Sequence, residues 1–231
     1  NAQNDTMYVM KNGLVISKYN VNTQIDSIIF YQDNETLIVD GDGNIYTSVT
    51  IGNQEWLREN LKTTSYLDGT PISKLTDNLD WENATGAGYC WHSNDSVNNF
   101  ATFGALYNWF TTEKSDLCPL GWHVPTAAEW DTLVTYLTNN GYGYEGSGSD
   151  VAKSLAADSL WNTSATAGDV GNDLISNNST GFNALPAGVR ASNGSFFHRL
   201  NFNVFWTATE KDSDPSMALS KGILYNSENV I

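Results

Sequence analysis

The segment from Leu117 to Gly141 constrains this chain more than any other part of its sequence. Thr126 is placed to cap the N-terminus of a helix, and Glu129, three residues later, can complete a capping box. Asn140 and Gly141 supply a stop signal. We therefore predict a helix of about 15 residues between these signals. Its buried face is marked by apolar side chains at the i, i+3, i+4 and i+7 positions, which are Trp130, Leu133, Val134 and Leu137.

Composition limits the class of partner that the chain can bind. Its 231 residues carry a net charge of −15, and only 16% of them are charged. Asn, Ser, Thr and Gly must therefore supply much of the polar surface, as in extracellular proteins. A chain this acidic, without a basic cluster, is repelled by nucleic-acid phosphates and by anionic lipid headgroups. We expect neither a nucleic-acid partner nor a membrane-surface partner.

Membrane and targeting signals are missing from the sequence as given. Its apolar runs fall short of the roughly 18 residues that a membrane-spanning helix needs. The sequence starts at Asn1 without a hydrophobic targeting segment. We therefore expect no membrane insertion by this chain, and either a cytosolic protein or one whose signal has been removed.

The N-terminal part of the chain has the pattern of a small β unit. Asn12 and Gly13 predict a tight hairpin turn, because both turn positions favour positive φ. A third strand is predicted over Ser27–Tyr31, and a polar break follows it. We predict an N-terminal unit over residues 1–38 and a main domain over residues 39–231. The two hairpin strands are predicted over Met7–Lys11 and Leu14–Lys18.

The main domain opens with an alternating pattern. Apolar and polar residues alternate from Ile45 to Ile51, which predicts a strand with Ile45, Thr47, Val49 and Ile51 on one face. A turn at Gly52 and Asn53 should return the chain as a second strand. That second strand is predicted over Gln54–Leu57.

Helical and strand patterns then follow one another in blocks. A short helix is predicted from Phe103 to Phe110, and another begins at a Ser149 cap and includes Ala156. Because blocks of strands flank the helices, the order indicates an α+β fold with two or three helices on one sheet. The late strands are predicted at Phe182–Pro186, Val189–Arg190, Ser195–Phe197, Val204–Thr209 and Met217–Tyr225.

Catalytic motifs are hard to find in this sequence. It has no nucleophile elbow, phosphate loop or dinucleotide fingerprint. His123 is the best single candidate for acid–base chemistry, although a packed histidine that bonds a backbone carbonyl is the favoured interpretation. Glu210 is a candidate ligand-facing carboxylate, and its alternative is a strand-end residue that anchors a turn or pairs with Arg190.

Metal and disulfide signals are weak. Asp40 and Asp42 offer oxygens at alternating positions, but Ile45 and Ile51 stand where a calcium loop needs Gly and Glu, so a β-turn is favoured. The histidines and cysteines lack zinc-site spacing. We expect no metal or cofactor, with Ca²⁺ as the alternative. Cys90 and Cys118 are the two cysteines, and spacing alone leaves a bridge between them open.

The region from Tyr142 to Ser179 predicts a long irregular loop. It is rich in Gly, Ser, Asn and Thr, and such a loop in a compact domain is typically functional or packed. We expect its apolar residues to fix it to the core and its polar face to meet a ligand. Aromatic rings in loops can stack on a sugar. The candidate ligand-binding residues are Trp91, Tyr142, Tyr144, Trp161, Arg190 and Glu210. The apolar residues expected to anchor the loop are Leu155, Leu160, Trp161, Val170, Leu174 and Ile175.

A succession of motifs over about residues 39 to 225 resembles the Fibrobacter succinogenes major paralogous domain family. The N-terminal unit also resembles a segment that often follows the signal peptide in Bacteroidetes surface proteins. The motifs that carry the family resemblance are Asp42–Tyr46, Ile51–Leu61, Asp68–Ile72, Tyr89–Trp91, Gly104–Trp109, Cys118–Pro125, Gly181–Arg190 and Trp206–Glu210.

The resemblance implies both a fold and a location. The family is similar to the C-type lectin-like and sulfatase-modifying folds, which implies helices packed on a twisted, mainly antiparallel sheet with long irregular loops. Its members are secreted or surface-anchored bacterial proteins, often lipoproteins, so a secreted or outer-membrane location is expected, with a lipid anchor upstream of Asn1 compatible with it. Members usually end in a strand that carries a cysteine. This chain stops at Ile231 without that strand, whose cysteine would be the expected partner of Cys118.

The resemblance also shapes the expected function. We expect a non-enzymatic recognition module of the cell surface that binds a glycan or a protein through its long loop face. One alternative is a structural component of a surface assembly such as a pilus tip or an adhesin. The other is a degenerate sulfatase-modifying enzyme, whose relatives work through C-terminal cysteines that this chain lacks.

Overall fold

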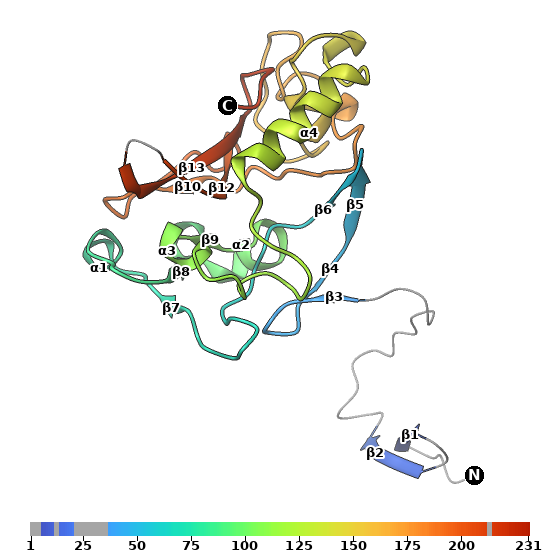
Figure 1. Cartoon of the computed structure of the whole chain (residues 1–231), viewed down its shortest axis with the longest axis vertical. Coiled ribbons are helices and arrows are strands. Elements are labelled where there is room, and N and C mark those ends of the chain that lie inside the picture. The colour runs from blue at the N-terminus through green and yellow to red at the C-terminus, as the bar shows by residue number, and fades with distance from the viewer. Residues whose placement is uncertain (1–5, 12–13, 21–36, 212–213) are drawn as a thin grey trace. The chain divides into compact units, whose positions relative to one another are not determined.

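The computed structural model describes residues 6–11, 14–20, 37–211 and 214–231 (Figure 1). The chain divides into two compact units, Asn1–Thr36 and Leu37–Ile231. In the first unit, β1 (Thr6–Lys11) pairs antiparallel with β2 (Leu14–Asn20), which confirms the two predicted hairpin strands. The predicted turn at residues 12–13 and the predicted strand at residues 27–31 lie outside the described residues.

The second unit is α+β, as predicted, but its strands form several small sheets in place of one twisted sheet. The pairs are β3–β4, β5–β6, β10–β11 and β12–β13, with a three-stranded sheet β7–β8–β9 in which only β7 and β8 run parallel. The strands are β3 (Ile38–Val39), β4 (Ile45–Tyr46), β5 (Ser48–Ile51), β6 (Gln54–Leu57), β7 (Ser73–Lys74), β8 (Gly88–Cys90), β9 (Leu106–Tyr107), β10 (Val189–Arg190), β11 (Phe196–Phe197), β12 (Phe202–Lys211) and β13 (Asp214–Leu224).

Within the described residues, five α-helices and three 3₁₀ turns accompany these strands, where two or three helices were predicted. No helix in the described part of the chain is both long and apolar enough to cross a bilayer. The α-helices are α1 (Asn78–Glu82), α2 (Ser96–Phe103), α3 (Trp109–Thr112), α4 (Ala127–Asn139) and α5 (Ala152–Leu155), and the 3₁₀ turns are η1 (His92–Asn94), η2 (Tyr144–Gly146) and η3 (Leu174–Ser176).

Helix α4 confirms the prediction from the sequence. The Thr126 hydroxyl accepts the backbone N–H of Glu129 at 3.2 Å, and the Glu129 carboxylate accepts the N–H of Thr126 at 2.7 Å, so the capping box is complete. The helix ends at Asn139, and the N–H of the C-cap residue Asn140 donates to the carbonyl of Leu137. Of the four predicted core residues, Trp130, Leu133 and Leu137 are buried, and Val134 is half-buried.

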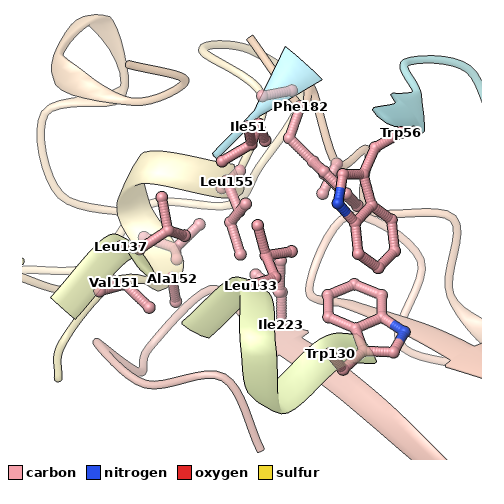
Figure 2. Packing of buried hydrophobic residues seen from close by; sticks show 14 of the residues in the cluster. Ile51, Trp56, Trp130, Leu133, Leu137, Val151, Ala152, Leu155, Phe182 and Ile223 are labelled. Atoms are coloured by element: carbon pink, nitrogen blue, oxygen red, sulfur yellow. The ribbon is translucent and has the colours of Figure 1, made fainter. Parts of the chain in front are cut away.

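Two hydrophobic clusters make up the core of the second unit. The first, here called the α4 cluster, surrounds the buried face of α4. Figure 2 shows the ring of Trp130, on this helix, opposite the ring of Trp56. Their ring centroids lie 5.0 Å apart, and Phe182 packs against both rings. The second, here called the β8 cluster, comprises the buried residues Tyr66, Ile72, Tyr89, Trp91 and Leu117.

The predicted strand over residues 45–51 is wrong in one respect. It is broken at Thr47, where β4 ends and β5 begins, and the buried face changes there. Ile45 is 44% exposed, whereas Tyr46 is 3% exposed and donates its hydroxyl to Asp40 at 2.5 Å. The Tyr46 hydroxyl also accepts the backbone N–H of Lys62, 16 residues away, so partners outside the strand override the alternation. The hairpin of β5 and β6 is confirmed, with Ile51 opposite Gln54.

The helix predicted over residues 103–110 is also wrong. Helix α2 ends at Phe103, β9 follows, and α3 starts after Asn108. Gly104 between them has a φ of +69°, and a Cβ there would lie 2.7 Å from the carbonyl oxygen of Leu61. The chain must turn away from helical geometry at this close approach, although the apolar spacing fits a helix.

The region after α4 is only partly as predicted. Helix α5 is a single short turn that starts after Val151 and has no side-chain cap, so the predicted Ser149 cap is wrong. The predicted strand over residues 182–186 is reduced to a bridge between Ala184 and Ala156. Of the apolar residues expected to anchor the loop, Leu160 is 44% exposed and Ile175 is 90% exposed. The remaining four pack in the α4 cluster: Leu155, Trp161, Val170 and Leu174.

Candidate functional site

A cleft of about 660 Å³ is lined by side chains from both hydrophobic clusters. Trp56, Trp130 and Phe182 of the α4 cluster contribute aromatic surface. On the other side, Leu117 of the β8 cluster contributes together with Tyr107, which packs against that cluster. A concave site of this size between two packed parts of a domain is a common place for a small ligand. Its residues come from β6, β9, the start of α4 and β12, so distant parts of the sequence build it.

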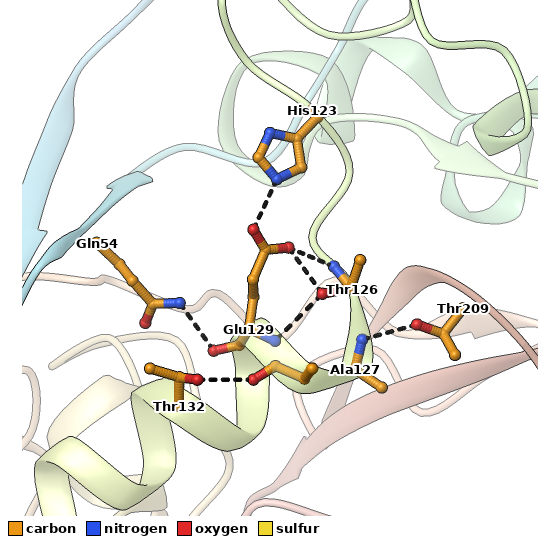
Figure 3. Close-up of polar contacts among 8 residues, drawn as sticks. Gln54, His123, Thr126, Ala127, Glu129, Thr132 and Thr209 are labelled. Carbon is orange, nitrogen blue, oxygen red and sulfur yellow. Dashed lines mark hydrogen bonds and ion pairs between the residues drawn. The ribbon is translucent and has the colours of Figure 1, made fainter.

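A histidine and a carboxylate form a pair in the lining of this cleft. His123 Nε2 lies 3.0 Å from Glu129 Oε1, and the His123 side chain is 66% exposed (Figure 3). The other carboxylate oxygen accepts both the N–H and the hydroxyl of Thr126, at 2.7 and 2.9 Å. The favoured interpretation of His123 as a packed residue that bonds a backbone carbonyl is therefore wrong. The sequence did contain a signal for the pair, because His123 lies three residues before the helix cap Thr126 and therefore close to Glu129.

Electrostatics keep Glu129 ionised. Partial burial acts to raise its pKa, but the hydrogen bonds from Thr126 and His123 outweigh burial and hold the pKa below its ordinary value. The negative charge also lies in the first turn of α4, where the helix dipole favours it. The site therefore presents an imidazole that is oriented by an ionised carboxylate.

Contacts from two other elements hold the start of α4 in place. The Gln54 side chain, on β6, donates to the backbone carbonyl of Glu129 at 3.0 Å. The hydroxyl of Thr209, on β12, accepts the backbone N–H of Ala127 at 3.0 Å. Figure 3 shows both contacts reaching the first turn from opposite sides. The helix start that carries Glu129 is consequently held by hydrogen bonds from β6 and β12.

The other charged side chains of the cleft mostly have partners. Arg58 donates through Nε to the carbonyl of Gly181 at 3.0 Å. Glu55 accepts the hydroxyl of Ser48, and Glu59 accepts the N–H and the hydroxyl of Thr47. Among the exposed ionisable side chains of the lining, Glu55, Arg58 and His123 each bond the protein through one polar atom and keep another polar atom without a partner in the described residues.

One side-chain contact joins the two walls of the cleft. The indole N–H of Trp206, on β12, donates to the backbone carbonyl of Tyr107, on β9, at 2.9 Å. The Tyr107 hydroxyl in turn donates to the carbonyl of Thr63 at 2.7 Å, and burial raises its pKa well above the ordinary value. The hydrogen bond between Trp206 and Tyr107 therefore holds β12 next to β9 in the lining of the cleft.

Arg190, predicted to bind a ligand, has its guanidinium saturated by the protein. The residue is 9% exposed and is stacked between Trp81 and Phe196, at 4.5 and 4.7 Å from their ring centroids. The alternative pairing of Arg190 with Glu210 is not formed, because Glu210 is exposed on β12 and makes no bond with Arg190. Arg190 therefore fixes the chain that enters α1. The oxygens that it binds are the carbonyls of Leu75, Thr76, Asp77 and Gly194 and the side-chain oxygen of Asn78.

The two predicted loop tryptophans are buried, which corrects the expectation that their rings face solvent. Trp91 is 5% exposed and packs edge-on against Tyr89 and Phe100. Trp161 is 3% exposed and donates its indole N–H to the carbonyl of Ala184 at 3.2 Å. Neither ring has an open face for a sugar to stack on.

The two predicted loop tyrosines do lie together. Tyr142 and Tyr144 line a smaller hollow of about 280 Å³, together with Glu145 and Lys153. Tyr142 is half-buried and packs against the α4 cluster, which leaves only part of its ring available. The structure thus separates the six predicted residues into this hollow, the core and the exposed end of strand β12.

Lys153 is a buried cation that the sequence gave no reason to select. The residue is 6% exposed, and its ammonium donates to the carbonyls of Asn172 and Asp173, the latter at 3.1 Å, and to the side-chain oxygen of Asn177 at 2.8 Å. Burial lowers its pKa, against the attraction of Asp173 and Asp169. The loop of residues 169–177 is therefore folded around a lysine ammonium.

The weak metal candidates form a turn. The Asp40 carboxylate accepts the backbone N–H groups of Asp42 and Asn44 at 3.0 and 2.9 Å, and Asp42 accepts the N–H and the hydroxyl of Thr64. These contacts agree with the favoured β-turn. Among the described residues, no three His, Cys, Asp or Glu side chains gather as a metal site.

Both cysteines are buried and unbridged. Burial raises the pKa of the Cys90 thiol to about 11, against the nearby Arg190, and that of the Cys118 thiol to about 12. The bridge between them that the sequence left open is absent from the structure. At neutral pH both sulfurs are therefore protonated and poor nucleophiles.

Comparison with known proteins identifies one family. The family model described as Fibrobacter succinogenes major domain matches residues 49–229, which include every residue of the cleft described above. No curated protein and no solved structure matches the chain.

Proposed function

This chain belongs to the Fibrobacter succinogenes major domain family, and we propose that it is a non-enzymatic recognition module that binds a neutral glycan in the cleft between the α4 and β8 clusters. The observation that carries the proposal is the lining of the cleft, which combines aromatic rings with the His123–Glu129 pair. The proposal includes a C-type lectin-like architecture and a secreted or cell-surface location. The composition, in which only 16% of the residues are charged and Asn, Ser, Thr and Gly supply much of the polar surface, supports that location.

The chemistry of the lining favours a sugar over other small ligands. A sugar ring presents apolar C–H faces, which pack on aromatic side chains, and hydroxyl groups, which need hydrogen-bonding partners at the edges. Trp122 and Trp206 are half-buried residues of the lining, so part of each remains accessible. A net charge of −15 repels anionic ligands, so the proposed ligand is neutral.

We place the ligand in the cleft in preference to the long loop of residues 142–179. The loop carries the smaller hollow, and Trp161, one of the rings expected to stack on a sugar, is buried. Thiol chemistry of the sulfatase-modifying kind is disfavoured, because Cys90 and Cys118 are buried with raised pKa values. Recognition without catalysis is therefore the function that the site supports best.

The proposal is tested with a defined panel of immobilised sugars. The full chain is applied to cellobiose, maltose, laminaribiose and N-acetyllactosamine, with digalacturonate as an acidic member. We expect retention on at least one neutral sugar and none on digalacturonate. Ala191→Trp, which fills the cleft from a half-buried position, should weaken that retention by at least about tenfold.

A matched control separates occupancy of the cleft from a general effect of an added ring. Ile175→Trp adds the same side chain at a residue that is 90% exposed and outside the lining, and should leave retention unchanged. Failure of the wild-type chain to bind to any of the four neutral sugars would overturn the glycan proposal. Equal loss in both variants would remove the cleft as its location.

A further inference from the structure

His123 has one nitrogen that the protein uses and one that it leaves free. Nε2 is bonded to Glu129, while Nδ1 makes no hydrogen bond with any residue in the described part of the chain. The side chain is 66% exposed and belongs to the lining of the cleft. The free nitrogen is therefore accessible to a ligand.

The partners of Glu129 determine which nitrogen carries the hydrogen. An ionised carboxylate can only accept hydrogen bonds, and both oxygens of Glu129 are engaged, one with Thr126 and one with His123. Nε2 must then be the donor. In the neutral imidazole, Nδ1 is consequently a bare lone pair, which can only accept.

We propose that His123 Nδ1 accepts a hydroxyl hydrogen of the neutral sugar bound in the cleft, and that Glu129 is the positioning residue that fixes this tautomer. This inference rests on the function proposed above and adds the residue that recognises the hydroxyl. Among the other charged groups of the lining, Glu59 and Arg190 have their side-chain polar atoms engaged by the protein, whereas Glu55 and Arg58 each keep a polar atom for other hydroxyl groups. His123 differs from them in the bond to Glu129 that orients its ring.

Glu129→Gln is the variant that tests the positioning role. Glutamine also completes a capping box, so its side-chain oxygen can still accept from Thr126 and keep α4 intact. Its amide nitrogen then faces His123 and donates to Nε2, which moves the imidazole hydrogen to Nδ1. Imidazole ¹⁵N chemical shifts in the free protein should show the Nε2–H tautomer in the wild type and the Nδ1–H tautomer in the variant.

Binding is then measured on each neutral sugar of the panel that the wild type retains. His123→Ala should lose about threefold to tenfold in affinity, the usual range for one hydrogen bond, and Glu129→Gln should lose a similar factor. Asp131→Asn is the matched control, because this carboxylate lies on the same helix but pairs with Lys221 and is outside the lining. It should bind like the wild type.

The outcomes separate the two proposals. Sugar binding that persists within about twofold in His123→Ala would overturn the role of His123 and leave the proposed function standing. A tautomer change in Glu129→Gln without a loss of affinity would overturn the acceptor role. Absence of any retained sugar in the wild type would overturn both. Unfolding midpoints of the variants must match the wild type, which the exposure of His123 favours.

Discussion

The start of α4 and the loop that follows this helix are stabilised in opposite ways. At the start of α4, Thr126 and Glu129 are three residues apart and satisfy each other at a partly exposed helix end. In the loop, Lys153 crosses to oxygens 19 to 24 residues away and is almost completely buried. The comparison teaches that local spacing suffices to specify a helix, whereas an irregular loop needs a buried polar centre that only the fold assembles.

The largest expected effect concerns the helix. Trp130→Ala should lower the free energy of unfolding by about 3 to 5 kcal/mol, because the ring is 1% exposed and packs against Trp56, Phe182 and Phe205. Chemical denaturation checks this. Val97→Ala, at a residue that is 89% exposed, is the control and should change the stability by less than about 0.5 kcal/mol. Equal midpoints for the wild type and Trp130→Ala would mean that the core is misplaced.

The next effect concerns the loop. Lys153→Met keeps the aliphatic stem but leaves the carbonyls of Asn172 and Asp173 and the Asn177 oxygen without their donor, so a loss of about 2 to 4 kcal/mol is expected. Limited proteolysis should show new cleavage within residues 169–177 before global unfolding. Lys74→Met, at an exposed position on β7, should do neither. Cleavage of both variants at the same rate would contradict the role of the ammonium.

A smaller effect tests the local side of the comparison. Thr126→Ala should cost about 1 kcal/mol, the usual value for a lost helix cap. Thr126→Ser keeps the hydroxyl that bonds Glu129 and should recover most of that loss. Thermal unfolding of both variants measures the difference. If serine and alanine were equally destabilising, the methyl group of Thr126 and not its hydroxyl would carry the effect.

The same contrast explains which parts of the molecule the sequence could predict. The capping box of α4 and the turn between β5 and β6 depend on residues that are close in sequence, so their patterns suffice. The buried face of β4 depends on the Tyr46 hydroxyl, which bonds the Lys62 backbone N–H 16 residues away as well as Asp40, and the break at Gly104 depends on the Leu61 carbonyl. Neither partner is implied by local periodicity.

The candidate site shows the same limit. His123 and Glu129 stand close together in one motif, and their pairing follows from the helix cap. By contrast, Arg190 binds oxygens more than 110 residues away, and Trp161 is covered by chain that returns after a long loop. The loop position and aromatic ring of Trp161 suggested ligand contact, and Arg190 was a candidate too, but the tertiary fold uses both for packing.

A still smaller effect concerns pH at the helix start. The pKa of Glu129 is lower in the folded state than its ordinary value, so its contribution to stability is present above the unfolded pKa and is lost as the pH falls through the folded pKa. The stability difference between the wild type and Glu129→Gln should therefore shrink from pH 6 to pH 3. It should stay under about 1 kcal/mol, because the side chain is 37% exposed and screened by solvent. A difference that grew on acidification would reverse the assigned sign.

The smallest expected effect is that of a chelator on the loop. Each kcal/mol of stability moves the unfolding midpoint of a domain of this size by about 2 to 4 °C. Because the Lys153 ammonium already occupies the oxygens of residues 169–177, and the Asp40 carboxylate is engaged by its own turn, we expect EDTA to shift the midpoint by less than about 2 °C. A fall of more than about 5 °C would contradict this, since it implies over 1 kcal/mol of stabilisation by an ion. The matched measurement is the unfolding midpoint of Lys153→Met with added Ca²⁺. Recovery of this midpoint would show that a metal cation can take the place of the ammonium among the loop oxygens. It would sharpen the contrast between a helix start whose polar groups bond their neighbours in sequence and a loop that depends on one buried charge.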